Sequence, residues 1–425
     1  MTTRPLLIIG GGISGITAAV EAAEAGMEVI LVEKQPYLGG RVARLSRYFP
    51  KLCPPQCGLE INYRRIRNSR NIHILTSSTV DKISGTKGNF TVRIERSAQY
   101  VNNLCTACGE CPAVCPVERP DEFYYGTRRT KAIFIPDEIT VPFRYTIDGD
   151  VCLKAGCAEC LSVCKYQAID LYAQPETITR EISGVILATG WKPYDAGRIP
   201  ELGFGSGDRI VTNVMLERLP VREFIVSLLP ARSSPVIAFA QCTGSRDRNH
   251  LPYCSGICCG TTLKQALMIR EQLPESRIKI FFIDLRVQGR NEDVLTRVLA
   301  DPNIELIKGK MAGARIQHND GLVEIEAEDI LNGRKIRTTV DLLVLATGMV
   351  PEQVGLDQVR TLDNGYIDRD SLPDGFFAVG NALHPADVPT SVKEATAAAL
   401  KGLQVVRSTP PHPLPIRGGA TGIGI

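Results

Sequence analysis

Clustered cysteines are the residues of this sequence whose types and spacing most directly predict chemistry. Eight of the 14 cysteines lie within residues 104–170, in two runs of four. The first run, with the spacing Cys-x-x-Cys-x-x-Cys-x-x-x-Cys-Pro, consists of Cys105, Cys108, Cys111 and Cys115. The second run, with two extra residues in its first gap, consists of Cys152, Cys157, Cys160 and Cys164. Loops of this spacing wrap their thiolates around a cubane, so the sequence predicts two [4Fe-4S] clusters.

The two runs are expected to exchange a ligand. In modules that hold two clusters, the fourth cysteine of each run binds the cluster of the other run. This pattern assigns one cluster to Cys105, Cys108, Cys111 and Cys164, and the other to Cys115, Cys152, Cys157 and Cys160. The longer first gap makes Cys152 the least regular ligand. The alternative is a zinc ribbon, which would use two Cys-x-x-Cys pairs rather than two runs of four.

A third group of thiols follows the strand expected at residues 236–241. Its members fall within 18 residues and are Cys242, Cys254, Cys258 and Cys259. If the loop folds back on itself, four thiolates suffice for a third cluster. Adjacent cysteines are more often core residues, but four in so short a loop favour a cluster in a chain that has two cluster runs. Cys53 and Cys57 do not complete a metal site, and we expect structural thiols or neighbours of a redox centre.

Residues 6–33 contain the first element that must position this chemistry. Leu6-Leu7-Ile8-Ile9 has the pattern of a buried strand and leads into Gly-x-Gly-x-x-Gly, followed by a helix expected over residues 16–25. In a dinucleotide-binding βαβ unit, Gly10 permits the tight turn, Gly12 lets the backbone approach a pyrophosphate, and Gly15 lets the helix pack closely. The turn, which includes Ser14, places N–H groups of the helix N-terminus at the phosphates.

Residues after the second strand of this unit are expected to contact the same dinucleotide. Glu33 lies 21 residues after Gly12, where a carboxylate accepts hydrogen bonds from ribose hydroxyls. The next loop offers Lys34, a close backbone approach at Gly40 and the guanidinium of Arg41 for a phosphate, although an ordinary turn is the alternative. Two later turns, each after a buried strand, add the expected contacts Ala188, Thr189, Gly190, Gly380 and Asn381.

A second α/β unit is expected to lack a nicotinamide site. Its first strand leads into Cys242-Thr243-Gly244 where a Gly-x-Gly-x-x-Gly turn would be needed. We therefore expect no reduction by NADH or NADPH. The phrase Leu-Ala-Thr-Gly ends buried strands at both Gly190 and Gly348, which predicts two related connections between the units.

Length and composition restrict the class of protein. A chain of 425 residues suffices for two or three domains, and 44% apolar with 22% charged residues is typical of a globular protein. A formal charge of +3 gives no reason to expect binding to nucleic acid. We find neither a signal sequence nor a run of about 18 apolar residues, and therefore expect a cytoplasmic protein.

These motifs resemble known flavoproteins. The unit of residues 10–33, the two Ala-Thr-Gly turns and Gly380-Asn381 resemble the thioredoxin-reductase-like flavoproteins, which hold FAD. The resemblance implies an α/β fold, a two-domain Rossmann-type FAD flavoprotein with an inserted ferredoxin-like [4Fe-4S] module. The expected segments are an FAD-binding domain in 1–98, 173–230 and 341–408, the insert in 99–172, a second Rossmann-like domain in 231–340 and a tail in 409–425.

Two narrower resemblances rest on the cysteine motifs. Residues 241–259 are similar to the A subunit of heterodisulfide reductases, in which four such cysteines bind a cluster beside the flavin. Residues 49–62 and 105–120 look like the A subunit of the quinone-interacting membrane-bound oxidoreductase. That resemblance implies electron transfer between the menaquinone pool and adenylylsulfate reductase. It also implies two partners, a haem-bearing membrane subunit together with a second soluble flavin and iron–sulfur subunit, through which the chain is peripherally associated with the membrane.

The main interpretation is an oxidoreductase, an electron-transfer flavoprotein subunit of a quinone-linked complex in dissimilatory sulfur metabolism. A heterodisulfide-reductase-type subunit that performs flavin-based electron bifurcation is the first alternative. A pyridine-nucleotide oxidoreductase decorated with a ferredoxin module, and a cluster-bearing scaffold without flavin, are the others. No catalytic side chain is assigned, because the cofactors carry the electron chemistry.

Overall fold

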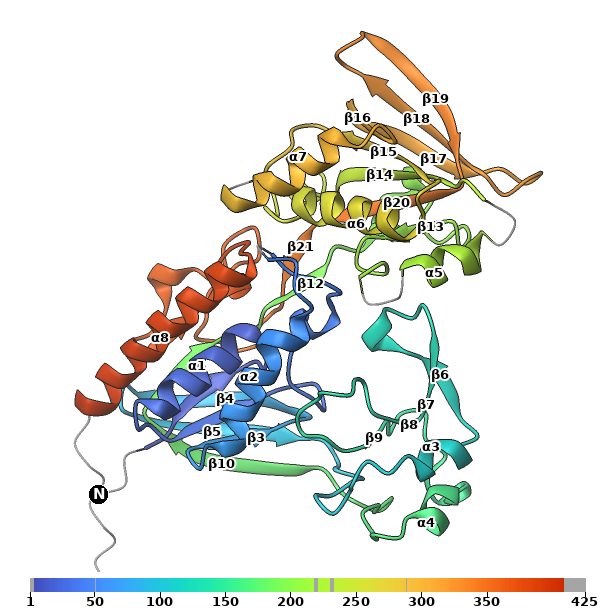
Figure 1. Cartoon of the computed structure of the whole chain (residues 1–425). Coiled ribbons are helices and arrows are strands. Elements are labelled where there is room, and N and C mark those ends of the chain that lie inside the picture. Colours follow the sequence, from blue (N-terminus) through green and yellow to red (C-terminus); the bar gives the residue numbers. More distant parts are fainter. Residues whose placement is uncertain (1–3, 50, 218–220, 230–232, 288, 409–425) are drawn as a thin grey trace, which may run out of the picture.

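The structure is a computed structural model that describes residues 4–49, 51–217, 221–229, 233–287 and 289–408. Figure 1 shows two α/β units joined by crossing strands, with a smaller module beside the first unit. The tail expected at residues 409–425 lies outside the described residues. Within the described part of the chain, no helix has the length and apolar character that a bilayer crossing requires.

The first unit is built on a five-stranded parallel sheet. Its order is β22 (Phe376–Ala378), β11 (Gly184–Leu187), β1 (Leu6–Ile9), β2 (Val29–Val32) and β3 (Ile72–Leu75). One face packs against α1 (Ile13–Glu24), α2 (Pro55–Asn68) and α8 (Val388–Ser408), and the other against β4 (Ser78–Thr86), β5 (Asn89–Arg96) and β10 (Glu176–Ile182) (Figure 1). Because successive side chains of a strand point to opposite faces, Leu6 and Ile8 join the helical core and Leu7 joins the other core.

The second unit repeats this layering on another five-stranded parallel sheet. Its order is β13 (Ile210–Thr212), β20 (Leu342–Thr347), β14 (Val236–Thr243), β15 (Arg277–Phe282) and β16 (Ile304–Lys308). One face is covered by α5 (Val221–Leu228), α6 (Cys258–Gln272) and α7 (Glu292–Ala300). The other face is covered by the antiparallel strands β17 (Met311–Ile316), β18 (Val323–Asp329) and β19 (Arg334–Val340).

Two short strands cross between the units. The strands that precede them show that two domain boundaries expected from the sequence are misplaced. β12 (Trp191–Pro193) and β21 (Met349–Pro351) pair antiparallel, and each follows one of the Leu-Ala-Thr-Gly turns. The boundaries expected at 230/231 and 340/341 are wrong, because β13 and β20 both belong to the second sheet. A buried apolar run shows that a strand exists but does not identify the sheet that the strand joins.

The insert leaves the first unit between two paired strands. β5 ends at Arg96 and its antiparallel partner β10 begins at Glu176, so the module occupies a single hairpin connection. Its elements are short and are β6 (Glu118–Pro120), β7 (Arg129–Lys131), β8 (Ile133–Phe134), β9 (Thr146–Ile147), α3 (Glu110–Val114) and α4 (Glu159–Val163). Backbone hydrogen bonds from Asn102 to Ala168 and from Asp170 to Tyr100 close its two ends.

Short 3-10 helices lie in the connections of the described chain. They are Val42–Arg44, Glu122–Tyr124, Lys154–Gly156, Ala196–Arg198, Pro200–Leu202, Gly289–Asn291, Arg369–Ser371 and Gly380–Ala382. The last of them lies between β22 and α8. Helix α8 extends beyond its Ala-rich centre at residues 391–400 and spans Val388–Ser408.

A buried ion pair of the second unit also binds a loop of the first. Lys264 on α6 donates a hydrogen bond of 2.7 Å to Glu217, and their side chains are only 3% and 2% exposed. Lys264 also donates to the Arg47 carbonyl of the first unit at 2.9 Å, while Gln265 donates to the other Glu217 oxygen at 2.8 Å. The pair therefore fixes α6, whose first turn carries Cys258, against a loop of the first unit.

We expect the substitution Lys264→Met to lower the free energy of unfolding by about 3–5 kcal/mol, because it leaves the buried Glu217 carboxylate without its cation. Urea titration followed by circular dichroism measures this change. The double variant Lys264→Met/Glu217→Leu should recover most of the loss, since it removes both charges. Lys279→Met, which breaks a more exposed pair with Glu305, is the matched control and should cost less than about 1 kcal/mol. Equal losses at the two lysines would contradict the prediction.

Candidate functional site

The first glycine turn lies where β1 meets α1. Gly10 has a φ of +108°, and a Cβ atom on it would overlap the Ala188 carbonyl at the end of β11. A Cβ atom on Gly15 would overlap the Gly10 carbonyl, so the helix can approach the turn only because both residues are glycines. Helix α1 begins after Gly12 without a side-chain cap. The N–H groups of its first turn are thus placed to meet an anion.

Glu33 is a buried acceptor directly beside this turn. Its two carboxylate oxygens accept hydrogen bonds from the backbone N–H groups of Gly11, at 2.5 Å, and Gln35, at 2.7 Å. Burial raises the pKa of Glu33 above its usual range, and these hydrogen bonds and the nearby Lys34 only partly oppose the rise. A carboxylate held in this way retains lone pairs for ribose hydroxyls, so the residues present fit a bound dinucleotide.

The two cations of the next loop have protein partners in the structure. Lys34 forms an ion pair of 3.1 Å with Glu352. Arg41 donates from Nε to the Trp191 carbonyl at 3.2 Å, and its guanidinium lies over the rings of Trp191 and Tyr125. Any phosphate contact of Arg41 is therefore left to its terminal nitrogens. No local pattern predicted these partners, because they lie far away along the chain.

Gly40 and the late Gly-Asn turn close around the same glycine turn. The backbone of Gly40 packs against Gly12, where a Cβ atom would lie 2.8 Å from the Gly12 Cα. A Cβ atom on Gly380 would lie 2.7 Å from the Ser14 hydroxyl oxygen. The structure thus gathers the expected residues of four distant segments at the carboxyl end of the first sheet, which is where α/β folds bind dinucleotides.

Side chains of the two later turns bind the surrounding backbone. Thr189 donates to the Glu352 carbonyl at 3.3 Å, and the Asn381 side chain exchanges two hydrogen bonds with the backbone of Ala386. Glu394 on α8 accepts from the Gly380 N–H at 2.7 Å and was not expected from the sequence. The one local signal for Glu394 is that an acidic residue interrupts an Ala-rich helix.

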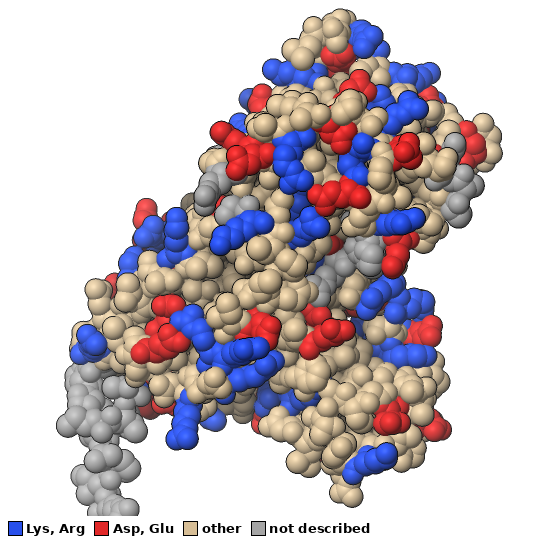
Figure 2. Space-filling view, viewed as in Figure 1, with Lys and Arg blue, Asp and Glu red and all other residues tan. Residues whose placement is uncertain are grey.

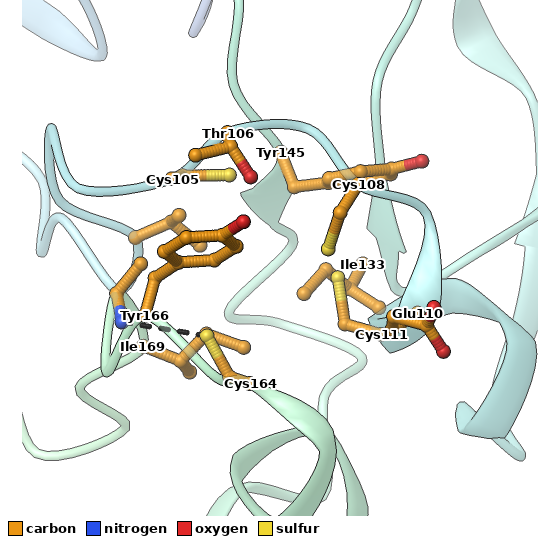
Figure 3. Close-up of a pocket in the computed structure, with 12 residues that line it drawn as sticks. Cys105, Thr106, Cys108, Glu110, Cys111, Ile133, Tyr145, Cys164, Tyr166 and Ile169 are labelled. Carbon is orange, nitrogen blue, oxygen red and sulfur yellow. Dashed lines mark hydrogen bonds between the residues drawn. The ribbon is translucent and has the colours of Figure 1, made fainter.

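The first cavity of the insert is lined by cysteines of both runs. They are Cys105, Cys108, Cys111 and Cys164, together with Ile133, Tyr145 and Tyr166. Figure 3 shows the four thiols directed into the same space. The N–H of Ala168 donates to the Cys164 sulfur at 3.4 Å, and burial followed by the neighbouring Cys105 raises the pKa of Cys111 to about 12. These four are the residues assigned to one cluster by the expected exchange.

The second cavity has the complementary lining. Its thiols are Cys115, Cys152, Cys157 and Cys160, again from both runs. The two cavities have the same small volume of about 20 Å³. Burial, and then the charge of neighbouring thiolates, raises the pKa of Cys160 to about 11. Thiols that repel one another as thiolates fit a cluster, whose iron supplies positive charge.

The geometry of the thiols is that of cavity linings rather than single-ion sites. Zinc would draw its sulfurs to ~2.3 Å from one centre. Among the residues that the structure describes, no three His, Cys, Asp or Glu side chains converge in a way that could hold one metal ion. The lining of each cavity by thiols of both runs, rather than by two Cys-x-x-Cys pairs, favours a cluster over the zinc ribbon considered above.

The third cysteine group lies at the carboxyl end of the second sheet. Cys242 has a φ of +58° at the irregular end of β14, and Cys258 and Cys259 occupy the first turn of α6. Burial raises the pKa of Cys258 far above its usual range, and the nearby Cys259, Cys242 and Cys254 raise it further. The structure thus brings the four thiols together, with Cys254 the most exposed of them.

Arginines surround this third group. The Arg246 guanidinium lies beside Cys242 and donates to Asp284 at 2.9 Å. Arg246, Arg248 and Arg286 line an open cavity with Cys254. Positive charge beside four thiols stabilises the thiolate form, which is the form that binds iron. The residues therefore fit a cluster at this site as well.

The cysteine loop is attached to both crossing strands. Tyr253 donates to the Met349 carbonyl of β21 at 2.9 Å, and Ser255 accepts from the Met349 N–H at 2.8 Å. Tyr194, next to β12, packs against Gly244 and hydrogen-bonds His250 at 2.6 Å. Cys53 and Cys57 lie outside this group, near Tyr48 in the first unit.

Comparisons with known proteins agree with this architecture. A family model for FAD-dependent oxidoreductases matches residues 5–56. The chain aligns over 95% of its length, and over 99% of theirs, with thioredoxin reductases from T. acidophilum (TM-score 0.54, 15% identity) and Lactococcus lactis (TM-score 0.52, 14% identity). These structures confirm the thioredoxin-reductase-like fold expected from the sequence.

Proteins with similar sequences have a much higher identity to this chain than the two solved structures do. The chain is 33% identical over 418 residues to the A subunit of the H2:CoB-CoM heterodisulfide, ferredoxin reductase of Methanothermobacter marburgensis, an alignment of 93% of this chain and 63% of the relative. It is 37% identical to an iron-sulfur A subunit of the CoB-CoM heterodisulfide reductase of Methanopyrus kandleri, over 94% of this chain and 64% of the relative. The chain thus spans less than two thirds of the length of these relatives.

We expect Glu33→Gln to weaken FAD binding by about 10- to 100-fold, because hydrogen bonds to a charged acceptor contribute about 1.5–3 kcal/mol. The affinity of the native protein for FAD should also decrease as the pH is lowered. Ribose hydroxyls donate to the carboxylate, so binding favours loss of the Glu33 proton and weakens as pH falls through the raised pKa. Flavin fluorescence titration of the FAD-free protein at several pH values measures both effects. Glu305→Gln is the control, and a Glu33→Gln protein that keeps the pH dependence would contradict the assignment.

The exchange of ligands predicts which cysteine variants share a phenotype. Cys105→Ser and Cys164→Ser should alter the same cluster EPR signal, although the residues belong to different runs, because they line one cavity. Cys115→Ser should alter the other signal, together with Cys152→Ser. Anaerobic EPR with iron analysis measures this grouping, and Cys53→Ser is the control. If Cys105 grouped with Cys115 instead, the runs would not exchange ligands.

Proposed function

We propose that this chain, an FAD-dependent oxidoreductase similar in sequence to the A subunits of heterodisulfide reductases, moves electrons between its flavin and three [4Fe-4S] clusters. Two clusters would lie in the insert and the third at Cys242, Cys254, Cys258 and Cys259. The observation that carries the proposal is the lining of the two insert cavities, each by four thiols drawn from both runs.

The first unit supplies the flavin site. The turn of Gly10, Gly12 and Gly15 would hold the pyrophosphate, with Glu33 on the ribose and Gly40 and Gly380 closing over them. Bound FAD supplies the capacity to exchange one or two electrons, whereas the protein binds the cofactor and orients it. The chain's own contribution is therefore positional, and no side chain is needed as an acid or base for electron transfer.

The third cysteine group is proposed to stand where a nicotinamide would otherwise bind. In open α/β sheets, ligands lie beyond the carboxyl ends of the strands, and Cys242 occupies the end of β14. The loop that follows contains thiols and arginines in place of a glycine turn for a pyrophosphate. This arrangement supports electron exchange through a cluster and argues against reduction by NADH or NADPH.

The partners are proposed from the relatives at a coarse level. We propose that the chain is the A-type component of a multi-subunit complex of the heterodisulfide reductase type. Other subunits would deliver electrons to its clusters and accept electrons from them. The flavin would divide or join electron pairs, as in electron bifurcation. Ferredoxin and the CoB-CoM heterodisulfide appear in the names of the relatives, and they are proposed here only as classes of partner to test.

A second candidate is the quinone-linked function expected from the sequence. It rests on the resemblance of residues 49–62 and 105–120 to the A subunit of the quinone-interacting membrane-bound oxidoreductase. This candidate would add menaquinone, adenylylsulfate reductase, a haem-bearing membrane subunit, and a second flavin and iron–sulfur subunit. The similarity to heterodisulfide reductase subunits supports the first candidate more directly.

The function is tested by loss of the third cluster. We expect Cys258→Ala to remove about four irons per chain, to retain FAD, and to slow flavin reduction within the purified complex at least tenfold. Stopped-flow absorbance with reduced ferredoxin, a menaquinol analogue and NADH as separate donors measures the rate. Ferredoxin as donor supports the first candidate, and the quinol analogue supports the second. Rapid reduction by NADH, or an unchanged iron content in Cys258→Ala, would overturn the proposal.

A further inference from the structure

Exposed apolar side chains are concentrated in the insert. Among the described residues, 15 large apolar side chains are exposed, and eight of them fall within residues 99–172. This segment is less than a fifth of the 425-residue sequence. Figure 2 shows the corresponding surface, at lower right, with wide areas free of charged side chains. The concentration requires an explanation, because single exposed apolar residues are otherwise scattered over a protein surface.

These side chains lie beside the cluster cysteines. Six of the eight are within two residues of a cysteine that lines one of the two cavities, and they are Leu104, Val114, Val151, Leu153, Leu161 and Tyr166. Tyr166 itself lines the first cavity and Leu153 the second. We call the surface of all eight side chains, with Phe143 and Tyr172 included, the cluster face. A partner that covers these side chains would also cover the loops that carry both sets of cysteines.

The size of the cluster face is that of an interface. The eight side chains are 37–72% exposed, which corresponds to on the order of 700 Å² of surface. The largest apolar patch on a typical monomer measures roughly 300–600 Å², and one partner of a stable complex contributes about 800 Å². A small module cannot bury all its apolar residues, but that limit alone would not place them beside the cysteines.

Charges on the two cluster loops indicate what kind of partner fits. The exposed charges beside these side chains are four acids and two lysines, so both signs are present with a small acidic excess; they are Glu110, Asp150, Glu159, Asp170, Lys154 and Lys165. A diffusible electron carrier is usually steered to its site by complementary charge. Permanent contacts between subunits are more apolar than transient contacts. Because large apolar side chains dominate the cluster face, it resembles a permanent contact between subunits.

We propose that the cluster face is a permanent docking site for another cofactor-bearing subunit of the same complex, held by apolar contact. The inference rests on the proposed function, because it assigns a partner to the insert clusters. A second copy of this chain is the competing occupant. It would place identical clusters against each other, which provides no driving force for electron transfer.

The test uses the complex purified through a tag on the full chain. The variant Leu104→Ser/Leu161→Ser/Tyr172→Ser removes apolar surface without touching a cysteine. We expect it to retain its FAD and iron but to bind at least tenfold less of the cofactor-bearing subunit, as measured by flavin, iron and mass analysis. The control Ile61→Ser/Leu299→Ser/Leu331→Ser removes comparably exposed apolar side chains elsewhere and should retain the subunit. Native association should also survive about 1 M salt, which screens charge-based docking.

Hydrogen exchange of the native chain provides a second readout that does not depend on a variant. Backbone amides near Leu104, Leu161 and Tyr172 should exchange more slowly in the complex than in the isolated chain. If they exchange equally fast, or if the triple variant keeps the subunit, the inference is overturned while the proposed function stands. Sedimentation showing a homodimer that the triple variant dissociates would assign the face to a second copy and would also overturn it. A native chain without iron or FAD would instead refute the proposed function.

Discussion

The pairing of β12 with β21 is the constraint on which the rest of the structure depends. Each strand leaves the carboxyl end of one parallel sheet through a Leu-Ala-Thr-Gly turn and crosses to the other unit. Ligand sites of such sheets lie at these ends. The glycine turn with Glu33 and the cysteine group at Cys242 are therefore both arranged around one short crossing, and Lys264 of the buried Lys264–Glu217 pair adds a hydrogen bond from the second unit to the Arg47 carbonyl of the first.

Signals carried by neighbouring residues predicted which side chains the structure brings together. The glycine spacing and Glu33 follow one another along the chain, and the structure places them in contact. The exchange of the fourth cysteine was expected from spacing alone, and the structure gathers the corresponding thiols around two cavities. The thioredoxin-reductase-like fold expected from the same motifs is confirmed by the solved structures. The glycine turn and each cysteine run are local features, because the chain needs only a turn or a short loop to form them.

Long-range pairing explains what the sequence could not predict. β13 and β20 are apolar strands whose sheet is decided by partners in another part of the chain, so the domain boundaries were misplaced. Glu352 pairs with Lys34 from far along the chain, and nothing near Lys34 indicates it, whereas the only signal for Glu394 is its place in an Ala-rich helix. The cations of the first loop consequently have protein partners that the loop's own sequence does not reveal. Parallel sheets depend strongly on such distant contacts.

The position of the insert has a consequence for the order in which the protein matures. The central strand β11 follows the insert along the chain, so the sheet that carries Gly10 stays incomplete until the whole insert has been synthesised. Chains emerge from the ribosome N-terminus first, and a loop costs less to close when a module within it has already brought its ends together. The hydrogen bonds between residues 100–102 and 168–170 join those ends. A folded insert would therefore lower the cost of completing the sheet that carries the glycine turn.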